Sequence, residues 1–322
     1  MSRIREIDDI KSALVVIMLL YHAASALPKY REDFIWLTEE LYFIHFAFVL
    51  VSGLLCGLHY NDRDRMGARP VRRELVVRGL KIWGIFLASN ILLYATSILH
   101  WPGGAKFLQL NGGMPFNMNG SIWAFEILYY IGAFLIASSC LLRPVPGWCV
   151  LLLGLGGIWF EQNNLIFCIG WGCIGFGLGD IIRSFSTGRV FENFRRWGWY
   201  ALPGLMLYLI FCNWKNIPHR SYWLVLETLL WFGTFIWLLG ISRCGHFLEE
   251  FGRYTMLAYL GQVVLMAALG RLLCRFSTSP PVVIYGVNLL ITMILLLIAL
   301  KMMDRIRKKV PVVDWSYRKI FG

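Results

Sequence analysis

The chain has 322 residues, of which 58% are hydrophobic and only 16% are charged, and its formal net charge at pH 7 is +12. Soluble domains carry roughly a quarter charged residues, so this composition excludes an ordinary soluble protein and indicates a polytopic membrane protein. The positive charge is expected to reflect membrane topology and attraction to anionic membrane lipid, and it does not predict binding of nucleic acid.

Apolar stretches close to the ~20 residues that a helix needs to cross a bilayer recur along the whole chain. They occupy residues 12–27, 41–59, 79–99, 121–142, 147–161, 164–182, 198–213, 222–242, 254–274 and 282–303. The predicted fold class is therefore all-α, a polytopic bundle of about ten transmembrane helices. We expect one transmembrane domain over residues 1–310 and a short cytoplasmic tail over residues 311–322.

The placement of lysine and arginine predicts the orientation of this bundle. If the N-terminus lies inside, the connections on the outer side hold few basic residues, namely Lys29, Arg31, Lys106, Lys215, Arg220, Arg271 and Arg275. The others fall on the inner side, apart from Lys81, which lies within the predicted span 79–99. By the positive-inside rule, both termini are predicted to be cytoplasmic.

The first predicted span contains two titratable side chains. Lys11 stands at its entry and His22 lies deeper, eleven residues further on. That spacing is close to a whole number of helical turns, so both side chains project from one face, about 16 Å apart along the axis. An imidazole with an ordinary pKa near ~6.5 can act as a general base within a membrane. A hydrogen bond from His22 to a neighbouring helix is the alternative interpretation.

The second predicted span ends in small residues, Ser52, Gly53 and Gly57, which favour close helix packing. A predicted cytoplasmic loop over residues 61–78 follows. It holds Arg63, Arg65, Arg69, Arg72, Arg73 and Arg78. Such a cluster can bind phosphate through charge-assisted hydrogen bonds, although membrane topology alone also accounts for arginines at this place.

The fourth predicted span carries Glu126 and Tyr130 one helical turn apart at its outer end. A carboxylate there could order a sugar hydroxyl or raise the basicity of a histidine. Trp123 and Tyr129 could stack on a sugar or belong to the aromatic belt of the membrane. Glu227, in the eighth predicted span, is suited either to an interhelical hydrogen bond or to catalysis, and we leave it outside the predicted site.

The eight cysteines are scattered, and none shows the Cys/His spacing of a zinc or thiol redox site. They are interpreted as small buried hydrophobic residues, and no metal site is predicted.

Several spaced motifs together resemble the integral-membrane acyltransferase family 3. The first is Ile7 and Asp8 followed by Lys11 and His22, and the second is the stretch from Phe48 to Gly53. Basic residues before the third span, then Trp123, Glu126 and Tyr130, and finally Gly252, Thr255 and Tyr259, follow in the family's order. Two positions depart from the pattern: the usual first-helix arginine is Lys11, and a frequent late histidine is Gln262. Lysine keeps the charge but loses the bidentate fork, and glutamine does not titrate.

The resemblance implies an O-acyltransferase with a cytoplasmic acyl-CoA donor and no permanently bound cofactor. Acetyl-CoA is the expected donor and succinyl-CoA the alternative. On the donor side, the resemblance implies a site formed by Arg72, Arg73, Arg78, Lys81 and Ser52.

For the chemistry, the resemblance implies that His22 is the general base or a transient acyl carrier, with Lys11 and Asp8 orienting the donor or each other. Glu126, Tyr130, Trp123 and Tyr259 would meet the acceptor, an exported or lipid-linked carbohydrate. The expected location is a bacterial cytoplasmic membrane.

Two other classes remain open on the sequence. A proton-coupled transporter or flippase would use His22, Lys11, Glu126 and Glu227 as a proton relay. No internal repeat is visible, which weakens this alternative. A catalytically silent membrane scaffold would tolerate His22→Ala.

Overall fold

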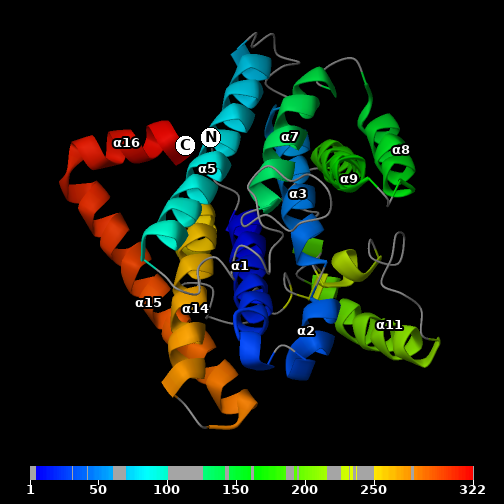
Figure 1. Ribbon diagram of the computed structural model, residues 1–322. Helices are drawn as coiled ribbons and strands as arrows, with labels where there is room; N and C mark the ends of the chain where they lie inside the picture. Colours follow the sequence, from blue (N-terminus) through cyan, green and yellow to red (C-terminus); the bar gives the residue numbers. More distant parts are fainter. Residues whose placement is uncertain are drawn as a thin grey trace. The chain divides into compact units, whose positions relative to one another are not determined.

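The computed structural model describes residues 5–30, 32–41, 43–60, 70–100, 126–141, 145–160, 163–185, 192–193, 196–215, 226–231, 233–234, 237, 250–276 and 279–321 (Figure 1). Every regular element within these ranges is helical, which confirms the predicted all-α class. Four helical segments there are long and apolar enough to cross a membrane: Val71–Leu92, Asn164–Ser184, Thr255–Arg275 and Pro281–Lys309. The number of ten spans and the cytoplasmic location of the termini stay predictions.

Helices occupy nearly all of the predicted apolar runs. They are α1 (Arg5–Ser25), α3 (Ile44–Leu55) with the π-helical η3 (Cys56–Tyr60), α5 (Pro70–His100), α7 (Glu126–Leu141), α8 (Gly147–Ile158), α9 (Asn164–Ser184), α11 (Ala201–Lys215), α14 (Thr255–Phe276) and α15 (Pro281–Lys309). Shorter elements are η1 (Pro28–Tyr30), η2 (Glu32–Phe34), α2 (Ile35–Glu40) and η4 (Gly198–Tyr200). The predicted run 222–242 lies largely outside the described residues.

The predicted loop over residues 61–78 is wrong in its second half, because α5 already begins at Pro70. Proline suits the first position of a helix, where its fixed φ fits and its missing N–H needs no partner. At a rise of 1.5 Å per residue, the 31 residues of α5 are about 46 Å long, which exceeds the ~30 Å hydrocarbon core. The basic first turns of α5 can therefore stay helical outside the hydrocarbon.

The predicted tail is also helical, since α16 covers Pro311–Phe321.

By contacts between Cα atoms, the chain divides into two compact units. The first comprises Met1–Ala47 and Phe185–Gly322, and the second comprises Phe48–Ser184. Each unit is described by itself. The expected single transmembrane domain over residues 1–310 stays a prediction.

In the first unit, α1 and α14 run parallel to each other in close contact. A Cβ at Gly252 would lie 2.2 Å from the backbone oxygen of Asp8, and one at Gly270 would lie 2.5 Å from the backbone oxygen of Ala26. These two glycines allow the backbones to approach where any side chain would intrude. The start of α1 and the segment just before α14 therefore share one end of the unit.

Helix α15 returns antiparallel along α14, so its C-terminal end reaches that same end. The hydroxyl of Tyr254 donates a 2.7 Å hydrogen bond to Asp304. At the opposite end of the unit, Phe34 stacks on Tyr285 with 4.9 Å between ring centroids, within a cluster that includes Ala24, Leu27 and Ile284. We call the end that holds Asp8, Tyr254 and Asp304 the basic end, because Arg305, Lys308 and Lys309 are exposed beside Asp304 on α15.

In the second unit, the glycine-rich helix α9 packs against several neighbours at backbone distance. One of its faces meets α3: a Cβ at Gly175 would lie 1.9 Å from the backbone oxygen of Leu50, and one at Gly53 would lie 2.0 Å from that of Gly172. Another face meets α8, where a Cβ at Gly177 would lie 2.6 Å from the oxygen of Gly147. The predicted packing role of Gly53 is thus confirmed.

Helices α5 and α7 of the second unit run antiparallel. Gly79 faces Gly132, and the indole Nε1 of Trp83 donates a 2.9 Å hydrogen bond to the backbone oxygen of Tyr129. The rings of Trp83 and Tyr129 are also stacked. This register fixes the depth of every side chain on the two helices relative to one another.

Candidate functional site

The start of α1 carries an ion pair in a largely buried position. Lys11 Nζ lies 3.7 Å from Asp8 Oδ1, and the Asp8 and Lys11 side chains are only 12% and 24% exposed. The hydroxyl of Ser12 donates a 2.8 Å hydrogen bond to the backbone oxygen of Asp8. Because Gly252 abuts this same turn, the pair is held where α1 begins, at the basic end of the first unit.

His22 lies near the other end of α1 in an aromatic environment and is partly buried. The ring of Tyr21 meets that of His22 edge to face at 5.2 Å between centroids, and meets that of His45 at 5.0 Å. The segment from Ile44 brings His45 to this place, and sequence reasoning did not assign it to the site. With a rise of 1.5 Å per residue, His22 is about 16 Å from Lys11 along the helix axis.

Tyr259, on α14, also belongs to the first unit and is 5% exposed. It follows Gly252 by about two helical turns and is in the second turn of α14, near the basic end. The adjacent helices α1 and α14 of the first unit hold the predicted residues Asp8, Lys11, His22 and Tyr259. Asp8 and Lys11 form an ion pair, whereas His22 lies near the other end of α1.

The second unit holds the other predicted residues. At the start of α7, the hydroxyl of Tyr130 donates a short hydrogen bond to Glu126 Oε1. Tyr130 is 8% exposed, so this carboxylate and phenol form a buried polar pair in an apolar helix. Their spacing of four residues places both side chains on one face of α7, as the sequence predicts. Trp123 lies outside the described residues.

The predicted phosphate-binding residues lie on the first turns of α5. Arg72 and Arg73 are exposed, whereas Lys81 is partly buried. Arg78 Nε lies 3.7 Å from Glu74 Oε1, so part of its charge is already engaged within the helix. Because Gly79 faces Gly132 and Trp83 contacts Tyr129, Arg73 and Glu126 are separated by about 20 Å along the helix axes. The basic and acidic parts of this unit are thus well separated along the helix axes.

Ser52, on α3, donates a 2.8 Å hydrogen bond from its hydroxyl to the backbone oxygen of Phe48. Such bonding to the preceding turn satisfies the hydroxyl within its own helix. Ser52 and the α5 residues belong to the second unit, while His22 belongs to the first.

Three further buried polar residues were not recognised as a group from the sequence. Gln262 on α14, and Asn288 and Thr292 on α15, are all 0% exposed. Their side-chain amide and hydroxyl atoms have no hydrogen-bonding partner among the described residues. Asn288 and Thr292 are one turn apart, and Asn288 lies beside Gly270. The sequence does contain a signal for this group, because its members are polar residues inside the apolar runs 254–274 and 282–303.

Within the part of the chain that the structure describes, no group of three histidine, cysteine, aspartate or glutamate residues is arranged to hold a metal ion. Comparisons with protein-family models, with curated proteins and with solved structures found no significant match to this chain. Its function is therefore argued from its own residues.

Proposed function

We propose that this protein is a membrane-bound O-acyltransferase that moves an acyl group from cytoplasmic acyl-CoA to a hydroxyl of an exported or lipid-linked carbohydrate. The observation that carries the proposal is the arrangement on α1. A partly buried imidazole at His22 shares an apolar helix with the ion pair of Lys11 and Asp8. Ionisable groups inside such a helix are costly and indicate function.

In this proposal the donor binds at the cytoplasmic side, and the exposed guanidinium groups of Arg72 and Arg73 hold its phosphates. Guanidinium suits phosphate because it offers paired N–H donors in one plane. The acyl group is acetyl or succinyl. Long apolar helices support an integral membrane protein, and the bacterial cytoplasmic membrane is the location we propose.

His22 then acts on the acceptor hydroxyl. As a general base, its imidazole takes the proton while the hydroxyl oxygen bonds to the thioester carbonyl carbon, the C–S bond breaks, and coenzyme A leaves as a thiolate that regains a proton. As a covalent carrier, His22 first receives the acyl group itself. General-base catalysis contributes typically about 10²- to 10⁴-fold. Glu126 and Tyr130 bind the acceptor from the outer side.

The test uses membranes that contain wild-type protein or His22→Gln, which keeps a polar side chain but does not titrate. The assay measures label transferred from acetyl-CoA and from succinyl-CoA into envelope glycan. The matched control is His59→Gln, a partly buried histidine of η3 outside the Tyr21–His45 cluster. We expect label with wild type and His59→Gln, and at least a ~10²-fold loss with His22→Gln. Equal labelling by a well-expressed His22→Gln variant would remove His22 from the chemistry.

A proton-coupled transporter is the second candidate, and the buried carboxylate of Glu227 favours it. Glu227 is 1% exposed and belongs to the same unit as His22. Acyl-CoA separates the two functions, because a ligand that binds only the folded state raises its unfolding temperature. Stabilisation of the detergent-solubilised protein by acetyl-CoA or succinyl-CoA supports the transferase. Transport driven by a pH gradient, without stabilisation by either thioester, supports the transporter.

A further inference from the structure

Helix α16 follows directly on one of the long apolar helices. The first 20 residues of α15, up to Leu300, carry no charge and match the hydrocarbon core in length at about 30 Å. Lys301 begins a charged stretch that continues to Lys309. This stretch, and α16 after it, therefore belong at the level of the lipid headgroups.

The chain changes direction between the two helices. Val310 has an extended backbone with φ −121° and ψ 98°, and Pro311 opens α16. A residue before proline is restricted to such extended conformations, so α15 ends here. Figure 1 shows α16 leaving the end of α15 at a sharp angle to the line of α15. A helix that leaves a membrane span in this manner is placed to lie along the membrane surface.

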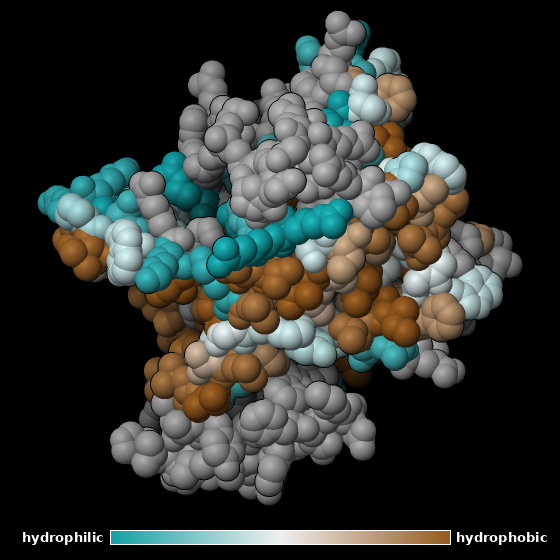
Figure 2. Space-filling model, turned by 90° about the horizontal axis from the view of Figure 1, so that it is seen from above, coloured by the Kyte–Doolittle hydropathy of each residue, from teal (hydrophilic) through white to brown (hydrophobic). Residues whose placement is uncertain are grey.

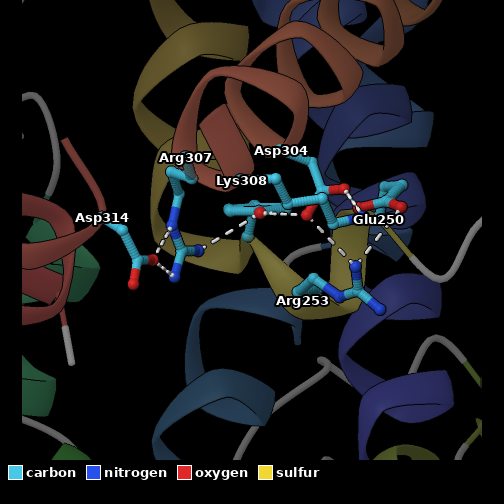
Figure 3. A network of polar contacts seen from close by, with 7 residues as sticks. Glu250, Arg253, Asp304, Arg307, Lys308 and Asp314 are labelled. Carbon is cyan, nitrogen blue, oxygen red and sulfur yellow. Dashed lines mark hydrogen bonds and ion pairs between the residues drawn. The ribbon is translucent and has the colours of Figure 1, made fainter. Parts of the chain in front are cut away.

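One face of α16 is fixed to the basic end of the first unit through Arg307 (Figure 3). Arg307 donates hydrogen bonds of 2.9 and 2.7 Å to Asp314 Oδ1, and one of 3.2 Å to the hydroxyl of Tyr254. Its guanidinium also lies 3.9 Å from the ring centroid of Tyr317. Burial raises the pKa of the Tyr317 hydroxyl, in opposition to the Arg307 charge.

The same contact network extends to the beginning of α14. Asp304 accepts hydrogen bonds from Arg253 at 3.3 Å and from Tyr254 at 2.7 Å, and it pairs with Lys308 at 2.5 Å. Figure 3 shows these groups converging between Glu250 and Asp314. Asp304 on α15 and Asp314 on α16 are thus engaged by cations of the protein, and Glu250 pairs with Arg253 at 3.7 Å. The network holds α16 in one orientation.

The exposed side of α16 carries large apolar side chains together with Lys319. Val312, Trp315 and Ile320 are 70%, 61% and 48% exposed. Lys319 Nζ lies 4.6 Å from the ring centroid of Trp315. Tryptophan and lysine together are typical of helices at membrane interfaces, where the ring lies among headgroups and the ammonium reaches the phosphates.

Exposed charge around this face is positive. Arg305, Lys309 and Lys319 are exposed, and the Lys308 side chain is 70% exposed. Figure 2 shows hydrophilic and hydrophobic side chains side by side in the region that α16 and the end of α15 occupy in Figure 1. Exposed apolar side chains with cations among and beside them complement a layer of anionic phospholipid headgroups.

We propose that α16 is an interfacial helix that binds the anionic leaflet next to the end of α15, with Val312, Trp315 and Ile320 among the headgroups and Lys319 on a lipid phosphate. The network around Arg307 orients this face toward the lipid. Membrane binding by α16 is independent of acyl transfer.

The experiment measures backbone hydrogen exchange of residues 311–321 in the full-length protein. The protein is reconstituted in nanodiscs of phosphatidylcholine alone or of phosphatidylcholine with phosphatidylglycerol. We expect exchange about tenfold slower in the anionic discs, because each basic residue near an anionic surface adds to the attraction. Lys319→Glu and Trp315→Ser should abolish the difference while leaving exchange in α14 and α15 unchanged. The matched control is Trp148→Ser, because Trp148 lies on α8 and is 59% exposed.

Equal exchange of α16 in both lipid mixtures and in detergent would overturn the proposal, since the Arg307 network alone would then account for the protection. Protection that depends on protein concentration rather than on anionic lipid would also overturn it, and would assign this face to a second copy of the chain.

Discussion

Replacement of Gly175 by alanine tests whether α3 and α9 meet at backbone distance. The new Cβ would lie 1.9 Å from the backbone oxygen of Leu50 and 2.9 Å from the backbone nitrogen of Leu54. Carbon contacts are favourable only from about 3.5 Å, so the two helices must separate by roughly 1.5 Å. Overpacking of this kind costs about 1–3 kcal/mol. The separation of the two helices would also break the neighbouring contact between Gly53 and Gly172.

The matched control is Gly84→Ala, because a Cβ at Gly84, within α5, meets nothing within 4 Å. Alanine favours a helix over glycine by about 0.5–1 kcal/mol at either position, so this gain cancels when the two variants are compared. Gly175→Ala should therefore be less stable than Gly84→Ala by about 1–3 kcal/mol. The assay is reversible unfolding of the purified protein in mixed micelles. Equal stability of the two variants would refute the close α3–α9 contact.

Four further substitutions, at three positions, test polar contacts. Asp180→Asn weakens the 2.8 Å hydrogen bond that Arg183 donates to Asp180, and it should lower the free energy of unfolding by about 1.5–3 kcal/mol. An unchanged unfolding curve would exclude a structural role for this pair. Tyr130→Phe removes the phenol hydroxyl that donates to Glu126. Because the proposed function assigns this pair to the acceptor, label transfer by a stable variant should fall about tenfold or more. Unchanged transfer would remove Tyr130 from the site. Lys11→Arg keeps the positive charge, so its label transfer should stay within about threefold of wild type, whereas Lys11→Ala should lose label transfer. Label transfer by both variants would show that the charge is dispensable.

Composition and hydropathy were sufficient to predict the helical class and the positions of most helices. Long apolar runs predict helices directly, because a buried backbone in lipid must satisfy its own hydrogen bonds. The start of α5 at Pro70 was not predicted, because the charged residues of the segment 61–78 were assigned to a loop. Charge, however, only shows that a segment leaves the hydrocarbon, and the proline at the first position was the better signal.

The polar contacts between distant residues could not be predicted. Asp304 pairs with Tyr254 across 50 positions of sequence, and nothing local in either segment specifies the other. The pair of Asp8 and Lys11 was accessible because one helical turn separates its members. His22 was selected for its titratable ring, but its neighbour His45 comes from another helix and depends on tertiary packing.

The two glycine contacts between α1 and α14 fix these helices against sliding. Gly270 lies on α14 and Gly252 lies just before it, 18 residues away, which corresponds to about 27 Å, close to the thickness of the hydrocarbon core. An axial shift of one residue would move both contacts by about 1.5 Å and force the Cβ atoms of other residues into the backbone of α1. The position of His22 along the first unit is therefore set by α14 as much as by α1. Any conformational change within the first unit should carry the two helices together as one rigid body.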